Sequence, residues 1–188
     1  NNFNKVLPAH LSEQANEALK SEYNLDFLGI TSPVLERELE NKLIENIRDL
    51  IMELGYGFCF MGNQYRIKLN QKEYFIDLLF YHRIQKCLVA IELKTVEFEP
   101  EFAGKMNFYL ELLDEQVKQG DDNPTIGIIL CPEKDEVEVE YALRATVKPI
   151  GVAEYKLTTE LPKELKGKIP NSKELKRMLT NAKMNTRF

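Results

Sequence analysis

Apolar residues at helical spacing indicate the strongest predicted helix, which spans residues 33–54. Its apolar stripe recurs with a period near 3.6 residues and comprises Leu35, Leu39, Leu43, Ile47, Leu50 and Leu54. Ser32 suits the N-cap, Pro33 the first helical position and Gly55 the end of this helix. The same reasoning predicts a long helix that Pro100 opens and Gly120 ends, and shorter helices over residues 11–23 (with Ser12 as N-cap), 136–147 and 171–183.

Apolar runs between these helices predict strands. They cover residues 57–61, 64–69, 74–81, 86–94, 125–131 and 149–157. Gly62 and Asn63 separate the first two runs and predict a bend or a bulge there. The run at 125–131 is apolar almost throughout, as expected for a strand buried on both faces. The order of elements predicts an α/β sandwich, in which a mixed central sheet flanked by helices begins as an antiparallel meander and continues through crossovers.

Composition limits the class of protein. The chain has 188 residues and is 44% hydrophobic, which suits one domain with a substantial core. No apolar stretch approaches 18 residues and no basic-then-apolar leader is visible, so we expect neither a membrane span nor a secretory signal. The first residue is not Met, which indicates a piece of a longer protein. The three cysteines, which are far apart in the sequence, are expected to be reduced core thiols of a cytoplasmic protein. They are Cys59, Cys87 and Cys131.

Charge and histidine content narrow the chemistry. The net charge of −5 argues mildly against a nucleic-acid partner, but Lys and Arg outnumber Asp and Glu by 8 to 2 between Leu161 and Phe188. This basic tail is either a solvated end of the chain or a DNA contact. The sequence has two histidines, His10 and His82, which disfavours a zinc site. Metal ligands should therefore be oxygens, which points to Mg²⁺ or Mn²⁺.

Two carboxylates stand in runs that otherwise predict buried strands, namely Asp77 and Glu92. If the two runs form a hairpin symmetric about Ile84 and Gln85, Asp77 lies directly opposite Glu92, with Cβ atoms about 4.5–5.5 Å apart. Lys94 then projects from the same face. Because opposed carboxylates repel, we expect a divalent cation between them, with Lys94 orienting the attacking water or stabilising the charged transition state.

The preceding hairpin is expected to add to the same face. A turn at residues 70–73 places Arg66 opposite Asp77 and Gln64 opposite Leu79. Gln64 and Arg66 would then flank the metal.

The predicted helices and the hairpin turn supply further candidates. Glu36 falls within the apolar stripe of the first long helix and Glu40 on its edge, and either could supply another carboxylate. On the second long helix, Lys105 and Tyr109 lie on a polar flank that could meet a phosphate backbone. Arg83, near the hairpin turn, could also touch a phosphate.

Each of these residues also has an ordinary structural interpretation. Asp77 could form a plain cross-strand ion pair with Arg66 or Lys94. The helix residues could be ordinary solvated positions, which applies to Glu36, Glu40, Lys105 and Tyr109. Near the predicted turn, the side chains of His82 and Arg83 are expected to face solvent.

The spacing of an Asp and a later Glu-x-Lys resembles the PD-(D/E)XK nuclease superfamily. Asp77 occupies the first position, and the ELK triplet at 92–94 the second. Longer stretches are similar to the C-terminal nuclease domain of the YhcG-type family over roughly residues 25–170. They read LIENIRDLIMELGYGFCFMGNQYRI, FIDLLFYHR, LVAIELK, FEPEFAGKMNFYLELLDE, PTIGIILC and PIGVAEYKL.

The resemblance implies a restriction-endonuclease-like core and a Mg²⁺-dependent endonuclease site that acts on DNA phosphodiesters. It implies that Asp77 and Glu92 are metal ligands, with the backbone carbonyl of Leu93 as a further ligand. It also implies that Lys94 is the catalytic lysine. Such proteins are thought to act in DNA processing or in bacterial defence against foreign DNA.

Some positions are less settled by the resemblance. A helical glutamate is common in the superfamily, and Glu36 and Glu40 both fit. Gln64 matches a glutamine typical of the family. The chain departs from the family pattern at Asn63, where a basic residue is expected, and after Lys94, where no glycine follows within three positions. These departures bear on DNA affinity and loop geometry.

We therefore expect residues 33–160 to form a metal-dependent DNA endonuclease domain. Residues 1–32 would be a helical arm or linker suited to oligomerisation, and 161–188 a basic tail with a short helix. Two alternatives stay open: a DNA-binding module that keeps the fold with little activity alone, and an oligomerisation or scaffold domain. Expected partners are DNA, a second copy of the chain, and the separate N-terminal domain that the family carries and this sequence lacks.

Overall fold

The computed structural model describes residues 1–157, so the predicted basic tail and its helix at 171–183 lie outside the described residues. The helices are α1 (Phe3–Val6), α2 (Ala9–Ala18), α3 (Glu36–Glu45), α4 (Ile47–Leu54), α5 (Pro100–Gln116) and α6 (Glu136–Arg144), with a 3-10 turn η1 (Asp26–Leu28). The strands are β1 (Glu22–Asn24), β2 (Phe58–Leu69), β3 (Lys72–His82), β4 (Cys87–Leu93), β5 (Ile126–Cys131) and β6 (Ile150–Lys156).

The six strands form one mixed sheet in the order β1-β6-β5-β4-β3-β2. The β2–β3 and β3–β4 pairs are antiparallel, whereas β4–β5, β5–β6 and β1–β6 are parallel. An antiparallel meander therefore continues into parallel crossovers, as predicted. The α/β class with a mixed central sheet flanked by helices is confirmed.

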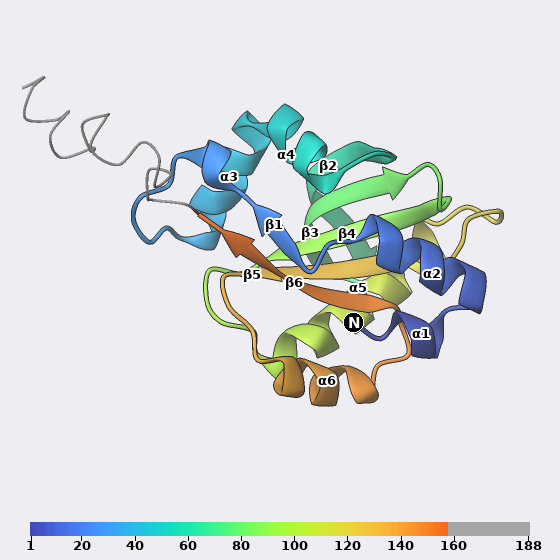
Figure 1. Cartoon of the computed structure of the whole chain (residues 1–188). Coiled ribbons are helices and arrows are strands. Elements are labelled where there is room, and N and C mark those ends of the chain that lie inside the picture. Colours follow the sequence, from blue (N-terminus) through green and yellow to red (C-terminus); the bar gives the residue numbers. More distant parts are fainter. Residues whose placement is uncertain (158–188) are drawn as a thin grey trace, which may run out of the picture.

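Helices cover both faces of this sheet (Figure 1). On one face, buried residues of α1 to α4 pack against the strands, including Phe3, Leu39, Leu43, Leu50 and Leu54. On the other face, α5 and α6 pack through residues such as Met106, Leu110, Leu113, Val139 and Leu143. The sheet is thus covered on both sides, and α3 and α5 approach the same end of β4 from opposite faces.

Local sequence signals fix the helices on the second face. α5 begins at Pro100, whose fixed φ suits the first helical turn. α6 begins after Asp135, whose side chain accepts hydrogen bonds from the N–H groups of Val137 and Glu138. Gly127 on β5 lets α5 approach closely, because a Cβ there would lie 2.6 Å from the Met106 side chain. This close approach holds the N-terminal half of α5 over the sheet.

The predicted helix at 33–54 is two helices, α3 and α4, so that prediction was wrong in its continuity and its start. The break falls at Asn46, whose backbone N–H and side-chain amide both donate to the Lys42 carbonyl at 3.1 and 2.8 Å. Helix α3 begins at Glu36, after Leu35, so Ser32 and Pro33 are not its N-cap and first residue. Leu35 is 71% exposed and lies outside the apolar stripe.

The N-terminal segment takes part in the main fold. β1 pairs in parallel with β6, and Phe3, Tyr23 and Leu25 are buried in the first-face core. The predicted boundary at residue 33 therefore falls inside a continuous core. Ser12 is a buried residue within α2 rather than its N-cap, and the second long helix ends at Gln116, before Gly120.

The three cysteines are free thiols, as expected, but their burial differs. Cys87 and Cys131 are buried, whereas Cys59 is exposed on β2, so the prediction of a core thiol was wrong there. Within residues 1–157, no helix has the length and apolar character needed to cross a bilayer.

Candidate active site

The register of the β3–β4 hairpin brings the two predicted carboxylates together. The strands pair from Leu78 with Ile91 to His82 with Cys87, in the predicted register, so the next pair outward is Asp77 and Glu92. The N–H of Leu93 donates to Asp77 Oδ2 at 2.8 Å, which fixes the carboxylate beside the end of β4.

Glu92 is almost wholly buried, with 3% of its surface exposed. Two ammonium groups compensate for this burial: Lys94 Nζ lies 3.3 Å from Glu92 Oε1, and Lys105 Nζ on α5 contacts the same oxygen. Glu92 Oε2 is buried and has no hydrogen-bond partner among the described residues. A buried carboxylate oxygen without a partner is costly, so it marks a position that a cation or a donor would stabilise.

Lys94 is held by groups from three elements. Its buried ammonium lies 3.3 Å from Glu36 on α3 and 5.1 Å from the ring centroid of Phe102 on α5. Tyr155 on β6 donates a hydrogen bond to the Lys94 carbonyl at 3.1 Å. Neither Phe102 nor Tyr155 was predicted to support the site, because these contacts depend on the packing of distant elements rather than on spacing in the sequence.

A distortion of β2 aims two side-chain amides into the same region. The β2–β3 register shifts between Phe60 and Gly62, and Gln64 has a φ of +44°, unusual for a residue other than glycine. Gln64 Nε2 donates to Glu40 Oε2 at 2.8 Å and to Asp77 Oδ1 at 3.1 Å. Asn63 also donates to Glu40, at 3.1 Å.

The predicted pairing of this second hairpin was wrong. Leu69 pairs with Lys72, so the turn contains two residues rather than four. Consequently Arg66 lies opposite Phe75, not opposite Asp77. Gln64 lies opposite Asp77, because the residues on either side of it pair with Leu78 and Ile76. Arg66 forms an ion pair with Glu73 at 3.0 Å on an exposed surface.

The two helical glutamates occupy different places. Glu40 is buried and bonded to the two amides, whereas Glu36 is half exposed and pairs with Lys94. The expectation that Glu36 lies within the apolar stripe was wrong, because α3 begins later than predicted. Through Gln64, Glu40 is connected to Asp77.

Burial and the nearby Glu92 raise the pKa of Asp77 from 3.8 to about 6. The Leu93 N–H and the ammonium groups of Lys94 and Lys105 oppose this rise. The Asp77 carboxyl is therefore a group that would gain from a further positive charge nearby.

The charges around the pair fit a divalent cation bound through oxygen. Four carboxylates (Asp77, Glu92, Glu40 and Glu36) accompany two ammonium groups (Lys94 and Lys105), which leaves negative charge in excess. In residues 1–157, no group of three or more His, Cys, Asp or Glu side chains is arranged to hold a metal. Mg²⁺ commonly uses one or two carboxylates together with water and substrate oxygens, so the pair suits it.

Two other predicted contacts have different surroundings. Tyr109 is buried beneath Lys105, whose ammonium lies 5.2 Å from its ring centroid, so these residues belong to the candidate site. Arg83 follows β3 at its far end, six residues from Asp77, or about 20 Å along an extended strand. His82 is buried at 2% exposure, so the prediction that it faces solvent was wrong.

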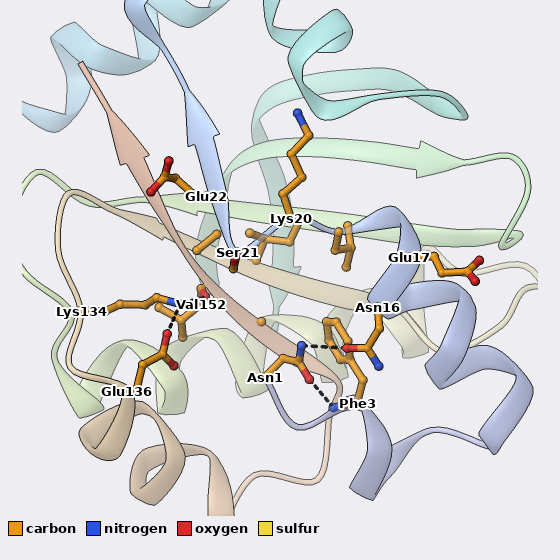
Figure 2. Close-up of a pocket in the computed structure, with 14 residues that line it drawn as sticks. Asn1, Phe3, Asn16, Glu17, Lys20, Ser21, Glu22, Lys134, Glu136 and Val152 are labelled. Carbon is orange, nitrogen blue, oxygen red and sulfur yellow. Dashed lines mark hydrogen bonds and ion pairs between the residues drawn. The ribbon is translucent and has the colours of Figure 1, made fainter. Parts of the chain in front are cut away.

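A cavity of about 630 Å³ lies away from these residues, beside the N-terminal segment, β6 and α6 (Figure 2). Figure 2 shows Lys134 reaching Glu136, at 2.8 Å, and Lys134 also donates to the Val152 carbonyl at 3.1 Å. None of the carboxylates or lysines of the candidate site lines this cavity.

The fold and the Asp and Glu-x-Lys arrangement define a PD-(D/E)XK nuclease domain. The sequence model of the family described as YhcG PDDEXK nuclease domain matches residues 16–170, and the chain belongs to this family.

Known proteins with detectable similarity include one curated relative and several solved structures. The relative, from Escherichia coli (strain K12), carries the name "Putative nuclease YhcG" and is 36% identical over 157 residues. The match covers 84% of this chain and 41% of the relative, so the chain spans about two fifths of that protein's length.

The solved structures are more distant. One is described as "Structure of EndoMS-dsDNA2 complex", with a TM-score of 0.46 and 19% identity, covering 66% of this chain and 46% of that one. Another is a repair endonuclease from Pyrococcus abyssi, with a TM-score of 0.42 and 18% identity, covering 69% and 49%.

Proposed function

We propose that this domain is a metal-dependent DNA endonuclease that hydrolyses phosphodiester bonds. The observation that carries the proposal is that the β3–β4 register brings Asp77 beside Glu92 at one end of β4, with Lys94 two residues further on. Membership of a nuclease family supports the reaction class.

Asp77 and Glu92 would hold Mg²⁺ or Mn²⁺, with the Leu93 carbonyl as a further ligand. When bound, such an ion lowers the pKa of its water and neutralises charge on the phosphoryl group. Glu92 Oε2, which has no hydrogen-bond partner within residues 1–157, and the raised pKa of Asp77 support this assignment, because both groups gain from added positive charge.

The lysines would act on the substrate. Lys94, buried between Glu92 and Glu36, would orient the attacking water and stabilise negative charge that develops on the phosphate. Lys105 is 45% exposed along its side chain, so it can contact a phosphate while Tyr109 supports its stem. Following the superfamily resemblance, the products would carry 5′-phosphate and 3′-hydroxyl ends.

Gln64 and Glu40 would position the pair. The Gln64 amide joins Glu40 to Asp77, so the amide holds the Asp77 carboxylate in one orientation. A positioning residue of this kind usually contributes about 10- to 100-fold to metal affinity or activity.

The substrate would be DNA, and a homodimer would allow one site to cut each strand. The relative described as EndoMS is named in complex with double-stranded DNA. Because the chain spans 41% of its curated relative, we propose that the whole protein adds a separate N-terminal domain that helps to select the DNA. Light scattering of the purified chain would test the dimer.

The test is a cleavage assay on supercoiled, linear and branched DNA with and without Mg²⁺ or Mn²⁺. We expect metal-dependent cleavage that is lost in Asp77→Ala and in Glu92→Ala. Glu138→Ala, which removes an exposed carboxylate on α6, is the matched control and should cleave as the wild type does.

A second readout separates binding from chemistry. Calorimetric titration with Mn²⁺ should show a site in the wild type that both alanine variants lack. Cleavage that persists in the variants, or wild-type protein that neither binds Mn²⁺ nor cleaves, would contradict the proposal.

A further inference from the structure

The β2–β3 hairpin extends beyond the rest of the sheet. β4 pairs with β3 from Leu78 onward, whereas β2 and β3 remain paired as far as Leu69 and Lys72. Residues 64–77 therefore form a two-stranded extension, here called the ribbon. Gln64 and Asp77 are the ribbon residues nearest the rest of the sheet, so the ribbon begins at the candidate active site.

The two faces of the ribbon differ. The inner face carries partly or fully buried apolar residues that pack toward α5, namely Tyr65, Ile67, Leu69, Tyr74 and Ile76. The Tyr74 ring lies 5.0 Å from the Phe108 ring, centroid to centroid, and 6.4 Å from that of Tyr109. The ribbon is therefore anchored to α5, which makes its outer face a fixed surface.

The outer face combines an exposed aromatic ring with positive charge. Phe75 is 42% exposed and lies directly opposite Arg66 in the strand register. Arg66 and Lys68 share a single counter-charge, Glu73, at 3.0 and 3.4 Å. Arg66 and Lys68 thus supply two cations beside the ring against one adjacent counter-charge, in a chain whose net charge is −5.

This face is continuous with the candidate active site. Phe75 and Asp77 are two residues apart on one strand, so about 7 Å separates them along it. That distance is close to the spacing between successive phosphates of an extended nucleic-acid strand. A nucleotide next to the scissile phosphate would therefore reach the Phe75 ring.

We propose that the outer face of the ribbon binds a single-stranded stretch of DNA beside the cut, with an unpaired base stacked on Phe75. Arg66 and Lys68 hold the phosphates of the same strand. The inference rests on the proposed function, since it places the ribbon beside a nuclease site. It assigns the substrate class: DNA with unpaired nucleotides at the cut, such as a fork or flap, is bound in preference to perfect duplex.

The physical reason is the availability of a base face. In a duplex, both faces of each base are already covered by neighbours, so an exposed ring gains little from contact. An unpaired base stacks on an aromatic ring independently of its sequence, and backbone cations add affinity that depends on salt.

The test measures binding in EDTA, where hydrolysis does not intervene, by fluorescence anisotropy. The probes are a perfect duplex and a forked duplex of the same length, with unpaired arms. We expect the wild type to prefer the fork, and Phe75→Ala to weaken fork binding about 5- to 100-fold while duplex binding changes less than about two-fold. Phe75→Tyr, which retains the ring, should restore fork binding.

Two further variants complete the design. Tyr141→Ala removes a ring that is 62% exposed on α6, away from the ribbon, and should bind both probes as the wild type does. Arg66→Gln should weaken both probes and reduce the slope of log affinity against log salt concentration by about 0.7–0.9.

The outcomes separate this inference from the nuclease proposal. Equal losses on fork and duplex in Phe75→Ala, or no loss, would overturn the inference whatever the cleavage assay gives. A Phe75→Ala protein that changes from dimer to monomer in light scattering would also overturn it, since the ring would then face a second copy. Fork preference without metal-dependent cleavage would contradict the nuclease proposal and leave the ribbon assignment standing.

Discussion

The two ends of the β3–β4 hairpin both bury polar side chains, but they stabilise them in opposite ways. At one end, Asp77 and Glu92 lie among ammonium groups, and Glu92 Oε2 has no partner among the described residues. At the other end, His82 packs edge-on against Phe58, with ring centroids 4.8 Å apart, and its Nδ1 accepts from the Gln85 N–H at 3.2 Å. Its Nε2, like Glu92 Oε2, is buried without a hydrogen-bond partner among the described residues, so the two ends differ in charge and not in this respect.

The difference distinguishes the proposed catalytic site from a packing site within the same two strands. Burial raises the pKa of Asp77 and lowers that of His82, so each group is pushed toward its neutral form. Around Asp77 the surplus of carboxylates leaves a position for another cation. Around His82 the neutral ring simply fills space beneath Gly57, where a Cβ would lie 2.9 Å from the ring. The pKa shifts of Asp77 and His82 alone would not have told the two ends of the hairpin apart.

The largest expected effect is on cleavage. Glu92→Gln should reduce the rate of metal-dependent DNA cleavage by about 10³-fold or more, because the proposed metal ligand would lose its charge. The measurement is single-turnover cleavage at saturating protein. His82→Ala, at the opposite end of the hairpin, is the control and should cleave at the wild-type rate below its unfolding temperature. Comparable losses in both variants would remove the distinction between the ends.

The second effect is on stability. Between pH 4 and pH 7, Asp77→Asn should gain about 3 kcal/mol of stability relative to the metal-free wild-type domain, because the raised pKa of Asp77 corresponds to about 1.4 kcal/mol per unit. The melting temperature should rise by roughly 6–12 °C.

The sign follows from linkage. A carboxyl whose folded pKa exceeds its unfolded value destabilises the fold above about pH 6 and does so less as pH falls, so the gain in Asp77→Asn should vanish below about pH 4. Calorimetry in EDTA between pH 4 and 8 measures it. A gain that is independent of pH would contradict the assignment.

The third effect belongs to the packing end. His82→Ala should lower the free energy of unfolding by about 2 kcal/mol, because it leaves a cavity beside Phe58. Urea unfolding measures the change. Arg83→Ala, at the neighbouring exposed position, should stay within about 0.5 kcal/mol of the wild type.

The smallest effect is a dependence on mild acid. Burial lowers the pKa of His82 in the folded state. The contribution of the neutral His82 ring to the free energy of unfolding is therefore complete above about pH 6.5 and is lost as pH falls below that value. The stability difference between wild type and His82→Phe should therefore shift in favour of the variant between pH 6.5 and 5. A difference that stays constant over this range would show that His82 does not titrate between the two states.

The β3–β4 register could be predicted because the apolar pattern of both strands constrains it. A slip of one residue would turn every apolar side chain of both strands to the wrong face, so the pattern allows few alternatives. Asp77 and Glu92 therefore fell opposite each other from sequence alone, and the strand pairs bear out the register.

The β2–β3 register could not be predicted from the same pattern. It depends on the turn, and Asn70, with a φ of +55°, makes a two-residue turn where four residues were expected. The bulge at Gly62 was anticipated, but the positive φ of Gln64 that directs its amide toward Glu40 is a tertiary effect. For this reason Arg66 was placed beside the carboxylates, although it lies further out on the ribbon.

The predictions were wrong at the boundaries of several helices and strands. Helical period alone does not register the interruption at Asn46, where local hydrogen bonds replace a continuous helix. Likewise, β1 has three residues and pairs at a sheet edge, so neither its length nor its alternation gave a signal. Lys105 and Tyr109 were candidates from the sequence, but the contact of Lys105 with Glu92 and the burial of Tyr109 beneath Lys105 required the fold.

The ammonium groups beside Glu92 have a consequence for how the protein is handled. Lys94 and Lys105 act as internal counter-ions for Glu92, so this buried carboxylate has compensating charge without a bound ion. Domains that use metal to fold unravel in chelators. This domain should keep its structure in EDTA and regain full activity when Mg²⁺ is restored. EDTA would therefore inhibit the proposed activity reversibly without unfolding the domain.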